Sequence, residues 1–188
     1  MDIVKRLLAI CAGGAAILIV LLVVAKPRPE LPLVGQRPGE FEAFDPGGAL
    51  CSNKDYGSGP VLYGFWLLST PDGAEAVRIL DRIARDEQMR GLPVVAVNLD
   101  ASSKRMREFV KDKDFTCVIL HMGDDPERLR RIMKLYHLTS GRLPRYFLIK
   151  FRYRIVADLE GPRTFEELKQ QILDVEMLPW ITGKGLTP

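Results

Sequence analysis

The sequence predicts an α/β fold, a central mixed β-sheet flanked by helices, behind one N-terminal transmembrane helix. Three observations predict it. Residues 7–25 are apolar and carry no charge. Buried-strand patterns and amphipathic helix patterns alternate between residues 60 and 137. Residues 145–159 then read as a β-hairpin followed by a helical pattern, and a βαβ unit with this ending implies one sheet with helices on both faces.

The composition argues against several classes of protein. A chain of 188 residues suits one compact domain with an anchor or a tail. A net charge of +3 favours neither nucleic-acid binding nor disorder. None of the three cysteines lies in C-x-x-C or C-x-x-C-H spacing, so a disulfide scaffold, a zinc ribbon and a haem attachment site lack support. We therefore expect no cofactor and no nucleic-acid partner.

The apolar segment "LLAICAGGAAILIVLLVVA", residues 7–25, predicts a membrane anchor because its helix would nearly span a hydrocarbon core of ~30 Å. Lys5 and Arg6 precede it, so the positive-inside rule places residues 1–6 in the cytoplasm. The alternative is a cleaved signal peptide, since Val23 and Ala25 fit a small-residue cleavage rule. The length of the run favours the uncleaved anchor, and we expect a bacterial inner-membrane protein whose domain lies in the periplasm.

The remainder of the chain divides into three parts. Residues 26–34 are rich in proline, which favours extended backbone, so we expect a stiff linker. A single α/β domain is predicted over residues 35–177. Residues 178–188 show little periodicity and are assigned as a C-terminal tail.

Within the domain, local patterns predict the individual elements. Thr70 is predicted as the N-cap of the helix over residues 71–90, with Pro71 at the first helical position. Asp125 caps a later helix, and Thr164 forms a capping box with Glu167. The predicted strands and helices cover residues 60–66, 71–90, 92–99, 102–113, 115–120, 125–137, 145–159 (two strands that turn around 150–153) and 164–175.

Several of these segments occur in a familiar order. "GPVLYGFW" before a capped helix, "VVAVNLD", "LYHLTSGRLPRYFLI" and "IVADLEGPRTFEELKQQI" follow one another as in thioredoxin-like proteins of the TlpA/ResA type. The chain most resembles the membrane-anchored thiol reductases of cytochrome c maturation, the DsbE/CcmG type. "LVGQRPGEFEAFDPGG" resembles the lead-in of that family. The resemblance covers about residues 35–173 and implies a thioredoxin-like fold.

The chain departs from this family at the redox site. When Phe65 and Trp66 are aligned with the family's FW pair, Thr70 takes the place of the attacking cysteine and Gly73 that of the resolving cysteine. Thiol–disulfide exchange needs a thiolate, which a threonine hydroxyl cannot supply. Gly73 has no side chain. The resemblance further implies that Pro144 is the cis-proline beside this degenerate site.

The remaining cysteines leave two alternatives open. Cys51 and Cys117 could form a structural disulfide in an oxidising compartment, or remain two separate half-buried thiols. We favour separate thiols, because nothing in the sequence brings their Cα atoms within bridging reach. Cys117 and His121 could face one side of a strand, but two ligands make a weak metal site. We expect a structural histidine and no metal.

Five residues are candidates for partner or anion contact. The Thr70 hydroxyl, the free N–H groups of the following helix and Arg145 could hold an anionic group. The favoured alternative is that Thr70 only caps and that Arg145 is a solvated residue at the sheet edge. Arg128 and Arg131 belong to a basic run that could face anionic lipid or a protein. Tyr146 adds contact area, which favours a protein.

Two functions compete at this stage. The first is a non-catalytic, membrane-anchored periplasmic module that binds a protein partner or serves as an accessory subunit of a membrane complex. The second is a thiol–disulfide oxidoreductase of cytochrome c maturation or disulfide metabolism that works through Cys51 or Cys117. The sequence favours the first, because no cysteine is placed where a thiolate would be stabilised.

Overall fold

The computed structural model describes residues 33–56, 59–150 and 154–175. The predicted anchor, most of the linker and the C-terminal tail lie outside the described residues. Within them, no helix combines the length and the apolar character needed to cross a bilayer.

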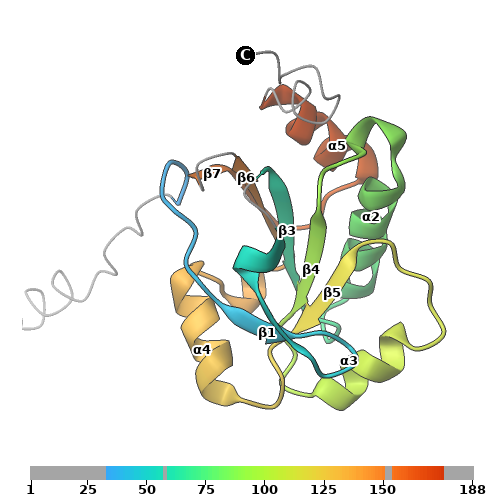
Figure 1. The fold of residues 1–188 in the computed structure, drawn as a ribbon, viewed down its shortest axis with the longest axis vertical. Helices are drawn as coiled ribbons and strands as arrows, with labels where there is room; N and C mark the ends of the chain where they lie inside the picture. The colour runs from blue at the N-terminus through green and yellow to red at the C-terminus, as the bar shows by residue number, and fades with distance from the viewer. Residues whose placement is uncertain (1–32, 57–58, 151–153, 176–188) are drawn as a thin grey trace, which may run out of the picture. The chain divides into compact units, whose positions relative to one another are not determined.

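The described residues form one seven-stranded mixed sheet, in the order β2–β1–β5–β4–β3–β6–β7 (Figure 1). The three central strands β5, β4 and β3 run parallel, and every other neighbouring pair is antiparallel. This arrangement confirms the predicted mixed sheet. The strands are β1 Glu42–Phe44, β2 Leu50–Ser52, β3 Val61–Trp66, β4 Val94–Asn98, β5 Val118–His121, β6 Arg145–Lys150 and β7 Arg154–Glu160.

Helices cover both faces of this sheet. They are α2 Gly73–Arg85, α3 Ser103–Val110, α4 Pro126–Leu135 and α5 Phe165–Asp174, with short 3₁₀ turns η1 Asn53–Tyr56, η2 Glu87–Met89 and η3 Ser140–Arg142. Two predicted caps are confirmed. The Asp125 carboxylate accepts from the N–H groups of residues 127 and 128, and Thr164 and Glu167 form the reciprocal capping box.

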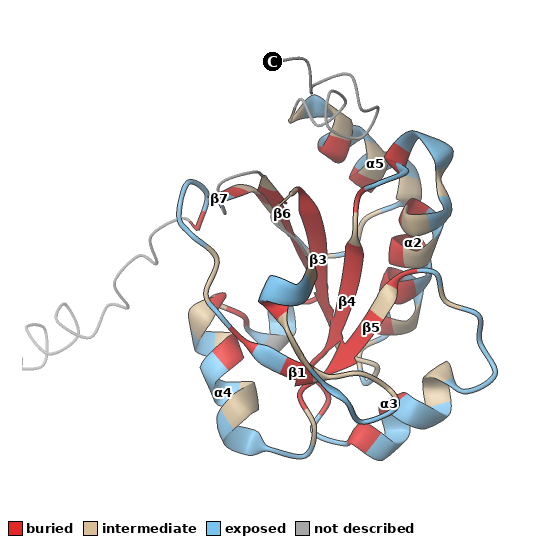
Figure 2. Ribbon diagram, viewed as in Figure 1, coloured by how far each residue is buried: buried red, intermediate tan, exposed pale blue. Residues whose placement is uncertain are grey.

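The core has two layers, one on each face of the sheet. Because side chains alternate along a strand, Trp66 packs into the layer under α2, α3 and α5, and Phe65 packs into the layer under α4. Both side chains are fully buried. Figure 2 shows the two central strands β3 and β4 buried along their length, as their continuous apolar sequences predict.

Several predicted boundaries differ from the structure. The helix predicted over 71–90 is α2 Gly73–Arg85 followed by the short turn η2, and two further differences follow from contacts between distant residues. The third core strand, predicted over 115–120, is β5 Val118–His121. It starts later because the N–H groups of Thr116 and Cys117 donate to the Asp81 carboxylate rather than to a neighbouring strand. At the N-terminal side, Leu33 of the predicted linker is 5% exposed and packs into the α4 layer. The Gly35 N–H then donates to the Ile155 carbonyl at 2.8 Å.

Candidate functional site

The site that the resemblance assigns lies where β3 ends. The chain leaves β3 at Trp66, turns through residues 67–72 and enters α2 at Gly73. Pro144 directly precedes β6, which pairs with β3, and its peptide bond with Leu143 is cis, as the resemblance implies. Asp72 and Pro144 line the same small pocket, so the β3–α2 turn and the proline lie side by side. In open α/β sheets this carboxyl end of the central strands is the usual place for a binding site.

The turn itself corrects one prediction. Thr70 does not cap α2: its Oγ1 donates to the Leu67 carbonyl at 2.9 Å, and the helix begins three residues later. The N-cap is Asp72, whose side chain makes no capping hydrogen bond. The N–H of Thr70 also donates to the Leu67 carbonyl, at 3.3 Å, and the Gly73 N–H donates to the Thr70 carbonyl at 3.2 Å. The turn is therefore closed by bonds within itself.

Asp100 fixes this turn from the neighbouring strand. Its buried carboxylate accepts from the Leu68 N–H at 2.5 Å and the Ser69 N–H at 3.3 Å. The amide of Asn98, at the end of β4, donates to the same carboxylate at 2.7 Å. We did not predict this role from the sequence. The available signal was the polar pair in "VVAVNLD", which directly follows a run of buried apolar residues.

Gly73 stands in a space that admits no side chain. A Cβ atom built there would lie 1.7 Å from the Leu67 carbonyl oxygen and 3.0 Å from Thr70 Oγ1. Cβ atoms do not approach backbone oxygens this closely, so the turn has to move before any larger residue fits. A cysteine at the resolving position is therefore incompatible with this backbone.

The two described cysteines, whose pairing the sequence leaves open, are both free in this structure. Cys51, on β2, packs against the core layer under α4. Cys117, just before β5, belongs to the layer under α2. The sheet separates the two residues, and they cannot act as a redox couple in this arrangement.

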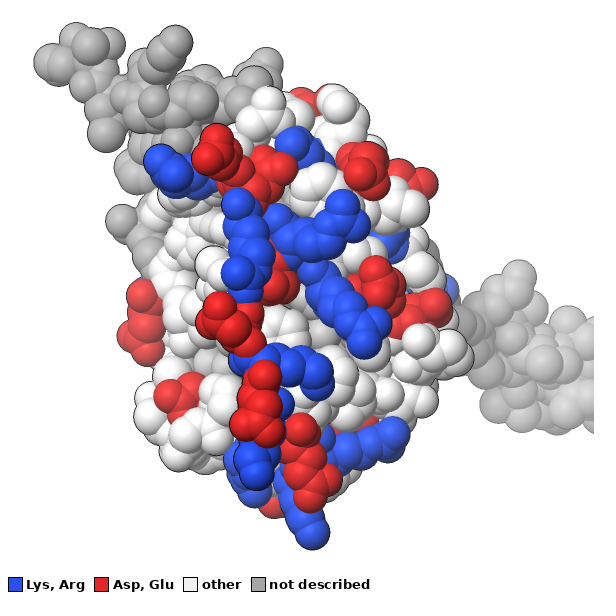
Figure 3. Space-filling view, turned by 90° about the vertical axis from the view of Figure 1, so that its right-hand side faces the viewer, with Lys and Arg blue, Asp and Glu red and all other residues white. Residues whose placement is uncertain are grey.

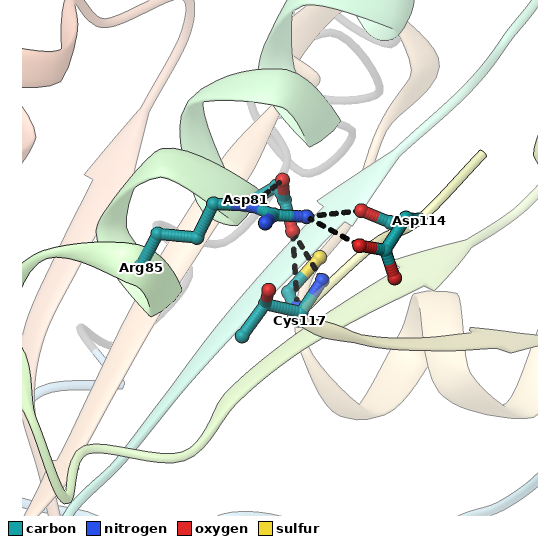
Figure 4. A network of polar contacts seen from close by, with 5 residues as sticks. Asp81, Arg85, Asp114 and Cys117 are labelled. Carbon is teal, nitrogen blue, oxygen red and sulfur yellow. Dashed lines mark hydrogen bonds and ion pairs between the residues drawn. The ribbon is translucent and has the colours of Figure 1, made fainter.

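Cys117 is embedded in a polar network that joins α2 to the start of β5 (Figure 4). Asp81 accepts from the Cys117 N–H at 3.2 Å and from Arg85 Nε at 2.8 Å. The Arg85 guanidinium also contacts the Asp114 carbonyl. Burial, together with the Asp81 charge, raises the pKa of the Cys117 thiol to about 12. This is the opposite of the lowered pKa that a nucleophilic cysteine needs.

Arg145 is not a solvated edge residue, nor is it turned to a partner. It is 7% exposed, and its Nε and Nη2 donate to the two Asp158 oxygens at 2.7 and 2.8 Å. Its Nη1 donates to the His137 carbonyl at 2.6 Å. Tyr146, expected to add contact area, is 1% exposed. Both side chains are buried, so neither contributes to the exposed surface of the domain.

Arg128 and Arg131 do come together, at a different place. They line a groove of about 550 Å³ between α4 and the β1–β2 segment. The Arg128 guanidinium lies 4.6 Å from the centre of the Phe44 ring. The groove is of mixed charge, because its other ionisable lining residues are Glu40, Glu42, Lys54, Asp125 and Glu127.

His121 ends β5 and is buried. Its Nδ1 accepts from the Gly123 N–H at 3.0 Å, and burial and the nearby Arg107 lower its pKa. Among the described residues no three His, Cys, Asp or Glu side chains are grouped as a metal site.

The face formed by α2 and its neighbours carries both signs of charge (Figure 3). Ion pairs such as Arg78–Glu75 at 3.2 Å and Arg82–Glu166 at 3.9 Å involve side chains that are more than half exposed. Such pairs contribute little to stability, and a surface of this kind offers no single-sign patch to a lipid bilayer or nucleic acid.

The fold described above is thioredoxin-like, as solved structures show. A protein assigned as the thiol:disulfide interchange protein DsbE of Chlorobium tepidum aligns with a TM-score of 0.64 and 23% identity, over 76% of this chain and 96% of that one. The thioredoxin domain of a thiol-disulfide oxidoreductase from Bacteroides vulgatus gives 0.61 and 15%, over 76% and 99%. StoA from Bacillus subtilis gives 0.57 and 22%, over 74% and 98%. No protein-family model and no curated protein sequence matches the chain.

Proposed function

We propose that this chain is a membrane-anchored, extracytoplasmic thioredoxin-like module that does not exchange disulfides and instead binds a protein partner, as an accessory subunit of a membrane complex. The observation that carries this proposal is the state of the β3–α2 turn. Thr70 and Gly73 stand at the two positions that the resemblance assigns to the redox pair, and the Leu67 carbonyl fills the space beside Gly73. The strand, the helix and the cis-proline around the turn are present, but neither redox position carries a thiol.

The cysteines elsewhere in the domain support the same proposal. A redox route needs two thiols within reach of each other, or one thiol held as a thiolate. Cys51 and Cys117 lie in different core layers. The pKa of the Cys117 thiol is raised rather than lowered. An oxidoreductase function would need thiol chemistry despite the separation of the two cysteines and the raised pKa of Cys117.

The contact surface that we assign to the partner is the carboxyl end of the central strands. It combines the β3–α2 turn, which Asp100 holds rigid, with the cis-proline segment beside it. A rigid turn loses little conformational entropy when a partner binds, which favours recognition. The groove lined by Arg128 and Arg131 is a second surface available to the same partner.

A reductase assay separates the two functions. The full chain in mild detergent is given insulin and dithiothreitol, alongside a variant in which Cys11, Cys51 and Cys117 are all serine. We expect both proteins to match the rate of dithiothreitol alone. Turnover by the natural chain that the serine variant lacks would overturn the proposal in favour of the oxidoreductase.

Partner binding is tested separately, by isolating the full chain from native membranes after crosslinking. We expect it to elute with a larger assembly. Recovery of the chain alone, with crosslinker and without, would contradict the accessory-subunit role.

A further inference from the structure

A small pocket opens beside the cis-proline. It has a volume of about 40 Å³ and lies between the first turn of α2, the start of β6 and the turn that leads into α5. Its lining includes Asp72, Glu75, Pro144, Tyr146, Pro162 and Arg163. By the usual measure of about 10–15 Å³ for each water-sized probe, it holds roughly three heavy atoms.

Two hydrogen-bonding groups at this pocket have no partner within the described part of the chain. They are the Tyr146 hydroxyl, on a side chain that is 1% exposed, and the Nε of Arg163. The two other buried tyrosines among the described residues differ: Tyr63 donates to the Asn53 carbonyl and Tyr136 to the Gly39 carbonyl, both at 2.9 Å. Buried polar groups nearly always have a partner, because leaving one unpaired costs free energy.

The lining defines which ligand satisfies both groups. Tyr146 and Arg163 offer two donors, which call for an acceptor oxygen. Asp72 and Glu75 also line the pocket and offer carboxylate acceptors. Asp72 makes no capping bond of its own, and one Glu75 oxygen already accepts from Arg78. A carboxylate ligand would be repelled by these two acids. An ammonium group could donate to the Tyr146 hydroxyl but would leave the Arg163 Nε–H unpaired. A primary carboxamide has an oxygen for the donors, an NH₂ for the acids and three heavy atoms.

We propose that this pocket binds the side-chain carboxamide of an asparagine or glutamine on the protein partner. The inference rests on the proposed function in one respect, that a partner docks on this end of the sheet. The hydroxyl and Nε are covered in the free protein, so the Arg163 side chain moves aside on binding. Arg163 is half-buried, and its Nη2 donates to the Glu160 carbonyl at 3.1 Å.

The test uses acetamide as the probe. The full chain, labelled with ¹⁵N-arginine and held in detergent micelles, is titrated with acetamide, with sodium acetate and with N-methylacetamide, which represents a backbone amide. We expect acetamide to shift the Arg163 Nε–Hε signal saturably, and the other two to bind at least tenfold more weakly. Absence of a saturable shift with acetamide overturns the proposal. Equal binding of N-methylacetamide overturns the assignment to a side chain.

A matched pair of variants checks the contact itself. Tyr146→Phe should weaken acetamide binding about tenfold, since it removes one donor. Tyr63→Phe removes an equally buried hydroxyl on the opposite face of the sheet and should leave binding unchanged. Equal loss in both variants, or in neither, would overturn the role of Tyr146.

Thermal unfolding supplies a readout that is independent of any ligand. Because its hydroxyl is unpaired, Tyr146→Phe should keep or raise the melting temperature, and Tyr63→Phe should lower it. A loss in Tyr146→Phe as large as in Tyr63→Phe would show that the hydroxyl is already satisfied, and the inference would fall. None of these readouts depends on recovering the partner, so failure here leaves the proposed function to its own test.

Discussion

Cys117 owes its chemical character to where its sulfur lies. It is 4% exposed in the layer under α2, and the Asp81 carboxylate lies beside it, where it accepts from the Cys117 backbone N–H at 3.2 Å. Both burial and a neighbouring negative charge disfavour a thiolate. Neither effect acts on the thiol in the unfolded chain, so the thiol pKa is higher in the folded chain than in the unfolded one. This difference makes the free energy of unfolding depend on pH in the alkaline range.

That link predicts a pH dependence. The folded pKa is raised from 9.0 to about 12, so the unfolded chain releases its proton first as the pH rises. The stabilisation is therefore complete below about pH 9 and declines between pH 9 and 12, by up to about 1.4 kcal/mol per pH unit. Urea unfolding across this range should show a steeper loss in the natural chain than in Cys117→Ala. Parallel profiles for the two proteins would contradict the raised pKa.

The buried ion pair of Arg145 is a contact that the sequence does not predict. Arg145 looked exposed because it is charged and follows a proline. Its partner Asp158 lies on the next strand, and the two residues meet only because Phe147 stands opposite Asp158 in the β6–β7 register. That register includes a bulge between Leu148 and Ile149. A pairing set by strand register across a hairpin is not visible in the local pattern around Arg145.

At the scale of elements, local signals succeeded where the local bonds decide the structure. Asp125 and Thr164 cap their helices as predicted, because each bonds N–H groups two or three residues ahead. Thr70 has the same kind of sequence context but a different role, because Asp100, about thirty residues away, holds the backbone of the turn in another shape. Tertiary hydrogen bonds overrode the propensity to cap.

The turn should therefore depend on Asp100. Asp100→Asn keeps the size of the side chain but removes its charge and one acceptor, so the bonds from Leu68 and Ser69 weaken. We expect a loss of about 1–3 kcal/mol in the free energy of unfolding and faster amide exchange at Leu68 and Ser69. Asp112→Asn, at an exposed position with φ near 60°, is the control and should change neither. Unchanged exchange at Leu68 would refute the anchoring role.

The turn also predicts that the redox pair cannot be restored by two substitutions. Thr70→Cys with Gly73→Cys should gain no insulin reductase activity, because the second side chain collides with the Leu67 carbonyl. Gly73→Ala alone should lose about 1–3 kcal/mol or more of stability. Gly141→Ala is the control, since a Cβ there meets nothing within 4 Å. An active, stable double variant would show that the turn adapts readily, and would remove the main support for a non-catalytic site.

For the molecule as a whole, the order of segments predicted more than any single motif did. The alternation of apolar strands and amphipathic helices predicted the mixed sheet. Because side chains alternate along β3, Phe65 and Trp66 lie in different core layers. What the order could not give was the contacts between segments distant along the chain. Leu33 illustrates this: proline-rich surroundings mark it as linker, yet it packs under α4.

Membrane attachment is the remaining prediction at this scale, and it depends on residues 1–25. We expect the full chain to stay with the membrane fraction in alkaline carbonate, and a reporter fused after residue 188 to be active only outside the cytoplasm. Lys5→Glu with Arg6→Glu should reduce that outside activity several-fold, because Lys26 and Arg28 then carry the positive charge that flanks the span. Lys104→Glu with Arg105→Glu makes the same charge change well beyond the segments that flank the span in the sequence, and it should have no effect. A mature N-terminus near residue 26, found by mass spectrometry, would instead establish a cleaved signal peptide. The mature protein would then lack the anchor that the proposed role as a subunit of a membrane complex requires.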